Sequence, residues 1–325
     1  MQARIPVIID CDTGVDDAVA LICGLASDKL DIRAITVVAG NQTLDKTSIN
    51  TLNLVDFLGY KVKVSKGAEM PLSRELITAE NVHGRSGMGG VKLPEASERF
   101  YEKNAVETIA EEALAAKGQL EIIAVGPLTN IALAILAHPF LKESIKRITL
   151  MGGSIDGGNH TPAAEFNVYV DPEAAQVVMN SGIPIVMVGL EVTEKAYLTK
   201  MEIESLDFWH AKDETSKTIR ALLENMLEIC TMFGYKGAVM HDPLALCYVL
   251  DESLIKTKAM NIQVETQGEI TRGKTVADRY LVTDRKPNAL VGLEIDRLRF
   301  VELIKELLNK YSQVSNQQEK WRRKK

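Results

Sequence analysis

Four aspartates lie within eight residues near the start of this 325-residue chain, directly after the apolar run at residues 5–9. They are Asp10, Asp12, Asp16 and Asp17, and no lysine or arginine lies between them. Carboxylates this close repel one another, so some must stay protonated unless a cation compensates their charge. Ligands that offer only oxygen suit a hard divalent ion, Ca²⁺ or Mg²⁺, rather than zinc. The cluster therefore indicates half of a metal site, although a helix N-terminus is an alternative explanation for Asp16 and Asp17.

Polar residues and glycines also follow several other apolar runs that we expect to be strands. Ligands of a parallel sheet bind beyond the carboxyl ends of its strands, which meet at one edge. This rule places the aspartates at the same edge as Gly40-Asn41, Gly126-Pro127 and Gly152-Gly153. The side chain of Asn41 is compatible with a ligand contact and equally with a helix cap.

A long loop follows the expected strand at residues 147–151. It contains Asn159, Glu165 and Asn167, whose side chains supply donors and acceptors suited to sugar hydroxyls. The alternative is a polar surface loop that only faces water, but its length and its position after a buried strand favour a functional role.

Two histidines lie near further candidate positions. His241 precedes Asp242-Pro243, but an aspartate before proline is usually an N-cap, so this spacing alone gives Asp242 no functional weight. His83 opens the glycine-rich stretch at residues 83–90, which lacks the Gly-Lys-Ser/Thr ending of a phosphate loop. A mobile flap and a plain surface loop are both compatible with that stretch.

The elements that must position these residues alternate along the first two thirds of the chain. Continuous apolar strands separated by helices predict an α/β fold, with an open, mainly parallel sheet covered by helices on both faces. The expected strands cover residues 5–9, 32–38, 61–65, 120–125, 147–151 and 184–189. The expected helices cover residues 15–27, 43–58, 104–117, 128–137 and 172–181.

The last third of the chain predicts a less regular portion made of helices and β-structure. Helical patterns cover residues 214–233, 242–250 and 296–311, and segments 257–266 and 274–283 alternate like a hairpin or a pair of edge strands. No repeat or linker divides the chain. We therefore expect one catalytic domain over residues 1–312, followed by a polar and basic frayed tail over residues 313–325.

The composition excludes several classes of protein. Hydrophobic residues make up 46% of the chain, the formal net charge is −6, and no segment before the basic end resembles a nucleic-acid groove. No apolar run approaches the roughly 18 residues of a membrane span, and no signal peptide is visible. The four cysteines form no C-x-x-C pair, which favours a reduced compartment. We expect a cytoplasmic protein that binds neither nucleic acid nor membranes.

Taken together, these residues resemble the inosine–uridine-preferring nucleoside hydrolases. The family's signature Asp-x-Asp-x-Gly-x-Asp-Asp-Ala stands here at residues 10–18, with Thr13 at a position where the family often has proline. Further matches follow in the family's order as far as about residue 245: Gly40-Asn41, Val125 to Asn130, Met151-Gly152-Gly153, Asn159, Glu165-Phe166-Asn167, Asp171 to Ala175 and His241-Asp242-Pro243.

The resemblance implies a Ca²⁺-dependent hydrolase that splits ribonucleosides into ribose and free base for nucleoside salvage. It implies that calcium is held by Asp12, Asp17, Asp242 and the backbone carbonyl of Val125, with Asp10 beside the metal site. It implies that the ribose is bound by Asp16, Asn41, Asn159, Glu165 and Asn167, with Met151 against the sugar. It further implies Asp12 as general base, His241 as the acid that protonates the leaving base, His83 near the base, and a homodimer or homotetramer.

Two other functions compete with this one. A haloacid-dehalogenase-type phosphohydrolase shares an Asp-x-Asp signature and would use Asp10 as nucleophile with Mg²⁺. It also needs a strand-end lysine and a later acidic pair, neither of which is clear here. The second is a non-catalytic nucleoside- or sugar-binding protein, against which the intact acids argue. The preferred base stays open, because Phe233 and Tyr235 are compatible with base stacking and with helix packing alike.

Overall fold

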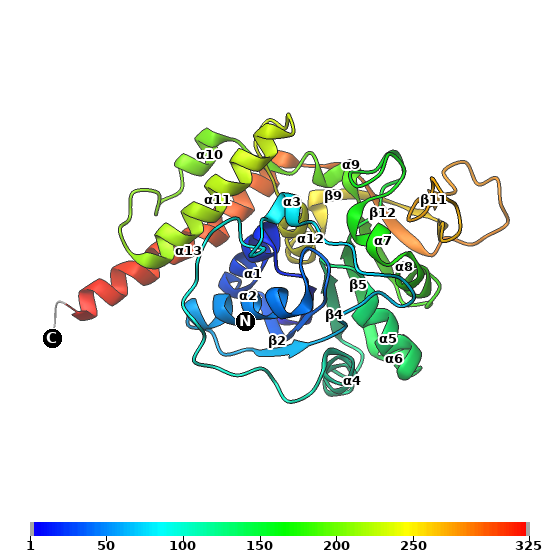
Figure 1. Cartoon of the computed structure of the whole chain (residues 1–325), viewed down its shortest axis with the longest axis horizontal. Coiled ribbons are helices and arrows are strands. Elements are labelled where there is room, and N and C mark those ends of the chain that lie inside the picture. The colour runs from blue at the N-terminus through cyan, green and yellow to red at the C-terminus, as the bar shows by residue number, and fades with distance from the viewer. Residues whose placement is uncertain (1–2, 323–325) are drawn as a thin grey trace.

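One eight-stranded sheet forms the centre of the molecule (Figure 1). The computed structural model describes the backbone of residues 3–322 and the side chains of residues 3–312. The sheet order is β3-β2-β1-β4-β5-β6-β12-β9, and neighbouring strands are parallel except for the antiparallel pair β12–β9. The strands are β1 (Ile5–Cys11), β2 (Leu30–Val37), β3 (Lys63–Lys66), β4 (Leu120–Ala124), β5 (Ile145–Met151), β6 (Ile185–Val188), β9 (Ile255–Met260) and β12 (Ala289–Ile295). The expected α/β class and mainly parallel sheet are confirmed.

Helices cover both faces of the sheet, because consecutive side chains of a strand point to opposite sides. In β1, Val7 and Ile9 pack into one apolar core and Ile8 packs into the other. The first core includes side chains of α1 (Val15–Ala26), α2 (Leu44–Phe57), α11 (Glu214–Met232), α12 (His241–Leu250) and α13 (Arg297–Arg322). The second includes side chains of α4 (Ala105–Ala115), α5 (Thr129–Ala137) and α8 (Pro172–Met179).

The helix α12 is buried from Asp242 to Leu250. A helix that is apolar all round belongs inside a protein, and α12 packs against α1, β5 and α13. Each fully buried leucine or isoleucine stabilises the fold by roughly 1.5–3 kcal/mol. The N-terminus of α12, which carries His241 and Asp242, is therefore held rigidly at the carboxyl edge of the sheet.

The C-terminal portion differs from the expectation in one strand. No strand was expected at residues 289–295, yet β12 joins the main sheet between β6 and β9. Its parallel partner β6 is far away in the sequence, and its exposure pattern does not alternate cleanly, so local periodicity did not reveal it. The expected segment 257–266 divides into β9, which is an edge strand of the main sheet, and β10 (Ile262–Val264), which pairs antiparallel with β11 (Thr275–Ala277) from the expected segment 274–283.

Several short elements complete the chain, and they were not expected. They are α3 (Glu80–His83), α6 (Leu141–Ser144), α7 (Phe166–Val170), α9 (Leu190–Thr193), α10 (Lys200–Glu204), β7 (Tyr197–Leu198), β8 (Ala238–Val239) and the 3₁₀ helix η1 (Glu252–Leu254). Helix α13 continues to Arg322, past the expected end at residue 311. The side chains of residues 313–325 lie outside the described part, so the frayed tail stays a prediction. Within that described part, no helix has the length and apolar character of a membrane span.

Candidate active site

The candidate site lies where the direction of the sheet reverses. From β1 the chain passes to β2 and β3 on one side, and β4 then returns to pair with the other side of β1. Such a switch point leaves a crevice at the carboxyl ends of the strands. Asp10 is the last residue of β1 that pairs on both sides, with Thr36 of β2 and Ala124 of β4, and Cys11 then pairs with Val37 of β2. Asp12, Asp16 and Asp17 follow β1 at this edge, as expected, whereas Asp10 belongs to the strand itself.

Three carboxyl groups from two helices meet in this crevice. Oxygen atoms of Asp16, Asp17 and Asp242 all lie within 4.8 Å of one another. Asp16 and Asp17 belong to the first turn of α1, and Asp242 belongs to the first turn of α12. The positive ends of two helix dipoles therefore face the same carboxylates, which favours negative charge between them.

Asp12 lies against this group without being one of the three. It is fully buried, and its Oδ2 accepts a hydrogen bond from the backbone N–H of Asn41 at 2.6 Å. Its backbone N–H donates to Oδ1 of Asp17 at 3.1 Å. Among the described residues, the Oδ1 of Asp12 has no hydrogen-bond partner. A buried carboxylate oxygen without a hydrogen-bond partner lowers the stability of the fold, so we expect a bound ligand or ion to interact with this atom.

Burial and mutual repulsion raise the pKa of the buried acids. Burial, followed by the charge of Asp16, raises the pKa of Asp17 to about 7. Burial and the charge of Asp17 raise the pKa of Asp12 well above its usual value. Burial raises the pKa of Asp242 in the same way, with Asp16 and Asp17 adding to it. The cluster therefore takes up either protons or a cation near neutral pH.

Asp10 is directed into the sheet edge and not into the open crevice. Its Oδ2 accepts hydrogen bonds from Oγ1 of Thr36 at 2.5 Å and from Nδ2 of Asn130 at 2.8 Å. Asn130 also accepts the backbone N–H of Ala68 at 2.8 Å. Burial raises the pKa of Asp10 to about 7. Asp10 thus connects β1 to β2 and α5, and sequence analysis gave no role to its partner Asn130.

A cavity of about 540 Å³ opens above the acids. It is lined by many of the predicted site residues: Asp16, Asn41, His83, Val125, Met151, Asn159, Glu165, Asn167, His241 and Asp242. The predicted residues Asp10, Asp12 and Asp17 do not line it, because they lie buried behind its wall. The tertiary structure therefore brings most of the predicted set to one cavity and places three aspartates beneath it.

Glu165 and Asn167 are held by hydrogen bonds at the start of α7. The carboxylate of Glu165 accepts the backbone N–H of Asn167 at 2.8 Å, that of Val168 at 3.1 Å and that of Gly153 at 2.9 Å. The Nδ2 of Asn167 donates to the carbonyl oxygen of Val125 at 2.9 Å and to that of Met151 at 3.2 Å. These bonds connect the loop after β5 to the ends of β4 and β5.

The remaining polar residues of the prediction are also fixed in place. The Nδ1 of His83 accepts the backbone N–H of Val15 at 3.2 Å, and the Nδ1 of His241 lies 2.9 Å from Oγ1 of Thr193. Burial lowers the pKa of both histidines. The Oδ1 of Asn159 accepts the backbone N–H of Phe166 at 3.0 Å.

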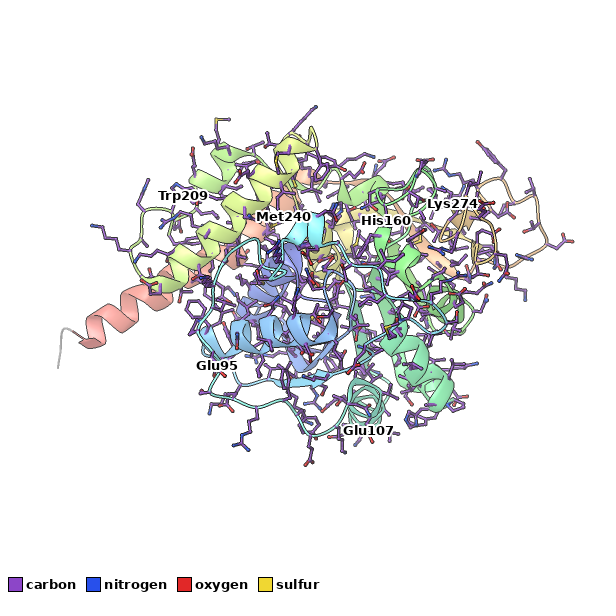
Figure 2. All side chains as sticks on the ribbon, in the orientation of Figure 1. Glu95, Glu107, His160, Trp209, Met240 and Lys274 are labelled. Atoms are coloured by element: carbon purple, nitrogen blue, oxygen red, sulfur yellow. The ribbon has the colours of Figure 1, made fainter. Side chains whose placement is uncertain are left out.

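One wall of the cavity was largely missed by the sequence analysis. Side chains of α11 and the segment after it line this wall, namely Met226, Ile229, Cys230, Phe233, Tyr235 and Val239. Residues 226, 229, 230 and 233 follow the i, i+3, i+4, i+7 spacing of one helical face. This spacing was the feature of the sequence that could have identified the wall. Other lining residues that were missed are Asn81, Val82, His160 and Glu194. Figure 2 labels His160, whose ring centroid lies 5.4 Å from that of Phe166, and Met240, which directly precedes α12.

The cavity therefore has two chemically different parts. Carboxylates and amides surround one end, which suits a polyhydroxylated sugar, and apolar and aromatic side chains form the other wall, which suits a flat ring. Oxygen atoms of three acids converge beneath the polar end. This arrangement suits a reaction at the bond between a sugar and a ring, assisted by a hard cation.

Comparison with known proteins agrees with this geometry. The family described as inosine–uridine preferring nucleoside hydrolase matches residues 7–302. The pyrimidine-specific ribonucleoside hydrolase RihA of Citrobacter koseri is 46% identical over 311 residues, which cover 95% of this chain and 99% of that protein. RihA of Salmonella typhimurium is 45% identical with the same coverage.

Solved structures show the same fold. A purine-preferring ribonucleoside hydrolase from Gardnerella vaginalis superimposes with a TM-score of 0.87 at 30% identity, and a plant nucleoside hydrolase with a TM-score of 0.88 at 30% identity. Both alignments cover 94% of this chain and 99% of the other. The chain therefore belongs to the inosine–uridine preferring nucleoside hydrolase family and is a hydrolase of N-glycosyl compounds.

Proposed function

We propose that this enzyme is a Ca²⁺-dependent ribonucleoside hydrolase that releases ribose and a free base, with pyrimidine nucleosides as its preferred substrates. The observation that carries the proposal is the meeting of three acidic oxygens within 4.8 Å beneath a cavity with one polar end and one apolar wall. The relationship to pyrimidine-specific hydrolases at 46% identity supports the base preference.

The residues at the site fit calcium. The available donors are oxygen atoms only, the Oδ1 of Asp12 is buried without a partner among the described residues, and burial raises the pKa of the neighbouring acids. A hard ion that prefers several oxygen ligands satisfies all three conditions. We assign its binding to Asp12, Asp17, Asp242 and the carbonyl oxygen of Val125. When bound, calcium lowers the pKa of a coordinated water and orients it.

Asp12 is the residue that we assign as general base. Burial and the charge of Asp17 raise the pKa of Asp12 above its usual range, which strengthens the affinity of this carboxylate for a proton from water. Because Oδ2 is held by the N–H of Asn41, the carboxylate cannot rotate freely.

The ribose is assigned to the hydrogen-bonded polar end of the cavity. Asp16, Asn41, Asn159, Glu165 and Asn167 line that end, and Met151 lies beside them. Cleavage of a glycosidic bond passes through a state in which the sugar ring gains positive charge. A carboxylate fixed by three backbone N–H groups, as in Glu165, stabilises that charge without having to reorganise.

The leaving base is assigned to the wall formed by α11 and by the two histidines. The hydroxyl of Thr193 fixes the orientation of the His241 ring, and His83 faces the same cavity. We assign His241 as the group that passes a proton to the departing base. It lines the cavity and directly precedes Asp242, which belongs to the acid cluster.

The test is a substrate panel with and without a chelator. Cytidine, uridine, inosine, adenosine and p-nitrophenyl phosphate are incubated with CaCl₂ or with EGTA, and reducing sugar, free base and phosphate are measured. Release of ribose from pyrimidine nucleosides that EGTA abolishes supports the proposal. Release of phosphate instead supports a phosphohydrolase, and binding of nucleosides without any product supports a binding protein.

We also propose that the enzyme serves nucleoside salvage in the cytoplasm as a homodimer or homotetramer. Large apolar side chains are exposed on the lobe formed by residues 270–282, with Ile270 82%, Tyr280 86% and Val282 82% exposed. An exposed apolar patch favours association of copies. Light scattering coupled to size exclusion measures the mass directly, and a monomeric mass contradicts the oligomer.

A further inference from the structure

Two polar side chains of the cavity wall take no part in the proposed chemistry. Glu194 follows the last residue of α9, and Tyr235 lies in the segment between α11 and β8. Both line the cavity. The hydroxyl of Tyr235 donates a hydrogen bond to Oε1 of Glu194 at 3.0 Å. Glu194 is exposed at the cavity wall, but this bond holds its carboxylate in one orientation and so offers a fixed acceptor to a ligand in the cavity.

The position of Glu194 places it on the side of the base. The residue before it, Thr193, holds the ring of His241 at 2.9 Å, so Glu194 stands beside the histidine assigned to the leaving base. Tyr235 follows the α11 face that bears Ile229 and Phe233, and both of those side chains line the apolar wall. Neither Glu194 nor Tyr235 makes a hydrogen bond to the Glu165–Asn167 segment that surrounds the sugar end.

The chemistry of this pair favours a donor on the ligand. An ionised carboxylate only accepts hydrogen bonds, and the phenol already donates to Oε1, so the lone pairs of Oε2 are left for the ligand. Burial and the neighbouring Glu194 raise the pKa of Tyr235 to about 12, so the phenol keeps its proton at neutral pH. An amino group meets this oxygen with a charge-assisted bond, whereas a carbonyl oxygen meets it with repulsion.

We propose that Glu194, oriented by Tyr235, selects nucleosides whose base carries an exocyclic amino group over those with a carbonyl at the same position. Among pyrimidines this means cytidine over uridine. The inference rests on the proposed nucleoside hydrolase function and deepens it by naming the residue that distinguishes the two bases. Hydrogen bonds to charged groups typically contribute enough for a preference of about tenfold at such a partly open site.

The experiment compares kcat/KM for cytidine and uridine in four proteins: the wild type, Glu194→Gln, Tyr235→Phe and Glu204→Gln. An amide at 194 accepts from an amino group and donates to a carbonyl, so it no longer distinguishes the two. We expect a cytidine-to-uridine ratio of about 10 in the wild type, about 1 in Glu194→Gln and an intermediate ratio of about 3 in Tyr235→Phe. Glu204, an exposed acid of α10 outside the cavity, is the matched control for the loss of one charge, and its variant keeps the wild-type ratio.

The outcomes separate this inference from the proposed function. Each rate is normalised to hydrolysis of p-nitrophenyl riboside, whose leaving group has no amino or carbonyl group of a base. A wild type that cleaves neither the riboside nor any nucleoside overturns the proposed function. A wild type that cleaves nucleosides but prefers uridine, or a ratio unchanged in Glu194→Gln, overturns the role of Glu194 alone. If Glu194→Gln does not fold by circular dichroism, the ratio in Tyr235→Phe decides, and an unchanged ratio there overturns the inference.

Discussion

Asp17 has two structural roles at once. Its carboxylate accepts the backbone N–H of Gly14 at 2.9 Å and that of Asp12 at 3.1 Å, and so closes the N-terminus of α1. The same carboxylate lies within 4.8 Å of Asp16 and Asp242. The two explanations that the sequence left open for this residue, a helix cap and an acid cluster, therefore both describe it. Asp17 is the third residue of α1, and its bond to the N-cap residue Gly14 fixes the carboxylate at the helix N-terminus and so limits its motion within the cluster.

Replacing Asp12 by asparagine tests its assignment as base. The variant keeps the size of the side chain and its acceptor for Asn41, but removes the group that takes the proton. We expect kcat to fall by about 10³-fold, with a melting temperature in EGTA close to that of the wild type in EGTA. Asp45→Asn, at an exposed position, is the control that keeps full activity. Activity of Asp12→Asn within tenfold of the wild type would remove Asp12 as the base.

Replacing His241 by alanine tests its assignment as acid. A natural base leaves much faster when it is protonated, whereas p-nitrophenolate leaves unaided, so the variant should lose about 10²-fold on cytidine and far less on p-nitrophenyl riboside. His210→Ala, at an exposed position, serves as the control. Equal losses on both substrates would show that His241 positions the sugar and does not deliver a proton.

At the scale of elements, the glycine-rich stretch at residues 83–90 is neither a free flap nor a plain surface loop. Side-chain amides of three other segments hold its backbone carbonyls. Gln42 donates to the carbonyl of Gly84 at 3.0 Å, Asn50 to that of Ser86 at 2.8 Å and Asn225 to that of Gly89 at 3.1 Å. Asn225 belongs to α11, so the loop that carries His83 is connected directly to the helix that lines the base wall.

Two neighbouring glycines of this loop make a matched pair for testing that connection. Gly89 and Gly90 both have positive φ, +57° and +84°, so alanine carries a similar backbone cost at each. A Cβ at Gly89 would overlap the side chain of Asn225, whereas a Cβ at Gly90 meets nothing within 4 Å.

We therefore expect Gly89→Ala to shift the loop and lower kcat/KM for cytidine by up to about 100-fold, mainly through KM. Gly90→Ala should lower it by much less. Steady-state kinetics measures both. Equal effects of the two substitutions would mean that the contact with Asn225 does not position the loop.

At the scale of the whole molecule, the fold assembles an acidic site that is incomplete until its charge is compensated. The carboxyl edge of the sheet brings the first turns of α1 and α12 together, and both are buried in one apolar core. Packing of that core holds several carboxylates in contact in spite of their repulsion. The stability of the whole protein is therefore linked to what occupies the acids.

This linkage predicts how calcium stabilises the protein at different pH. Because the folded protein raises the pKa of Asp17 from 3.8 to about 7, the contribution of this group without metal is fully present below about pH 4 and is lost as the pH rises through 7. Calcium binds the ionised form, so its stabilisation grows over the same range. Differential scanning fluorimetry should show a larger gain in melting temperature from CaCl₂ over EGTA at pH 8 than at pH 5.5.

The control for this experiment is Asp242→Asn, which removes an assigned ligand and should lose most of the calcium-dependent gain. Asp45→Asn, an exposed acid, should keep it. A gain of the same size at pH 5.5 and pH 8 in the wild type would contradict binding to ionised acids.

Local pattern determined much of this protein. The expected strands overlap all six of the strands β1 to β6, because strands buried on both faces are mostly apolar. The exception is β3, which is only four residues long and has a lysine at each end. The rule that parallel strands present ligands at their carboxyl ends placed the aspartate cluster, Asn41 and Gly152-Gly153 at one edge from the sequence alone. The resemblance to a known family supplied Asp242, which its own spacing did not distinguish from an ordinary cap.

Only the tertiary structure decided how distant segments meet. Three features depend on contacts between residues far apart in the chain. Asp242 joins Asp16 and Asp17, and β12 pairs with β6. Glu194 and Tyr235 complete the base wall with α11. Sequence periodicity reports which side of an element is buried, but not which other element covers it. Packing of the complete core makes that choice.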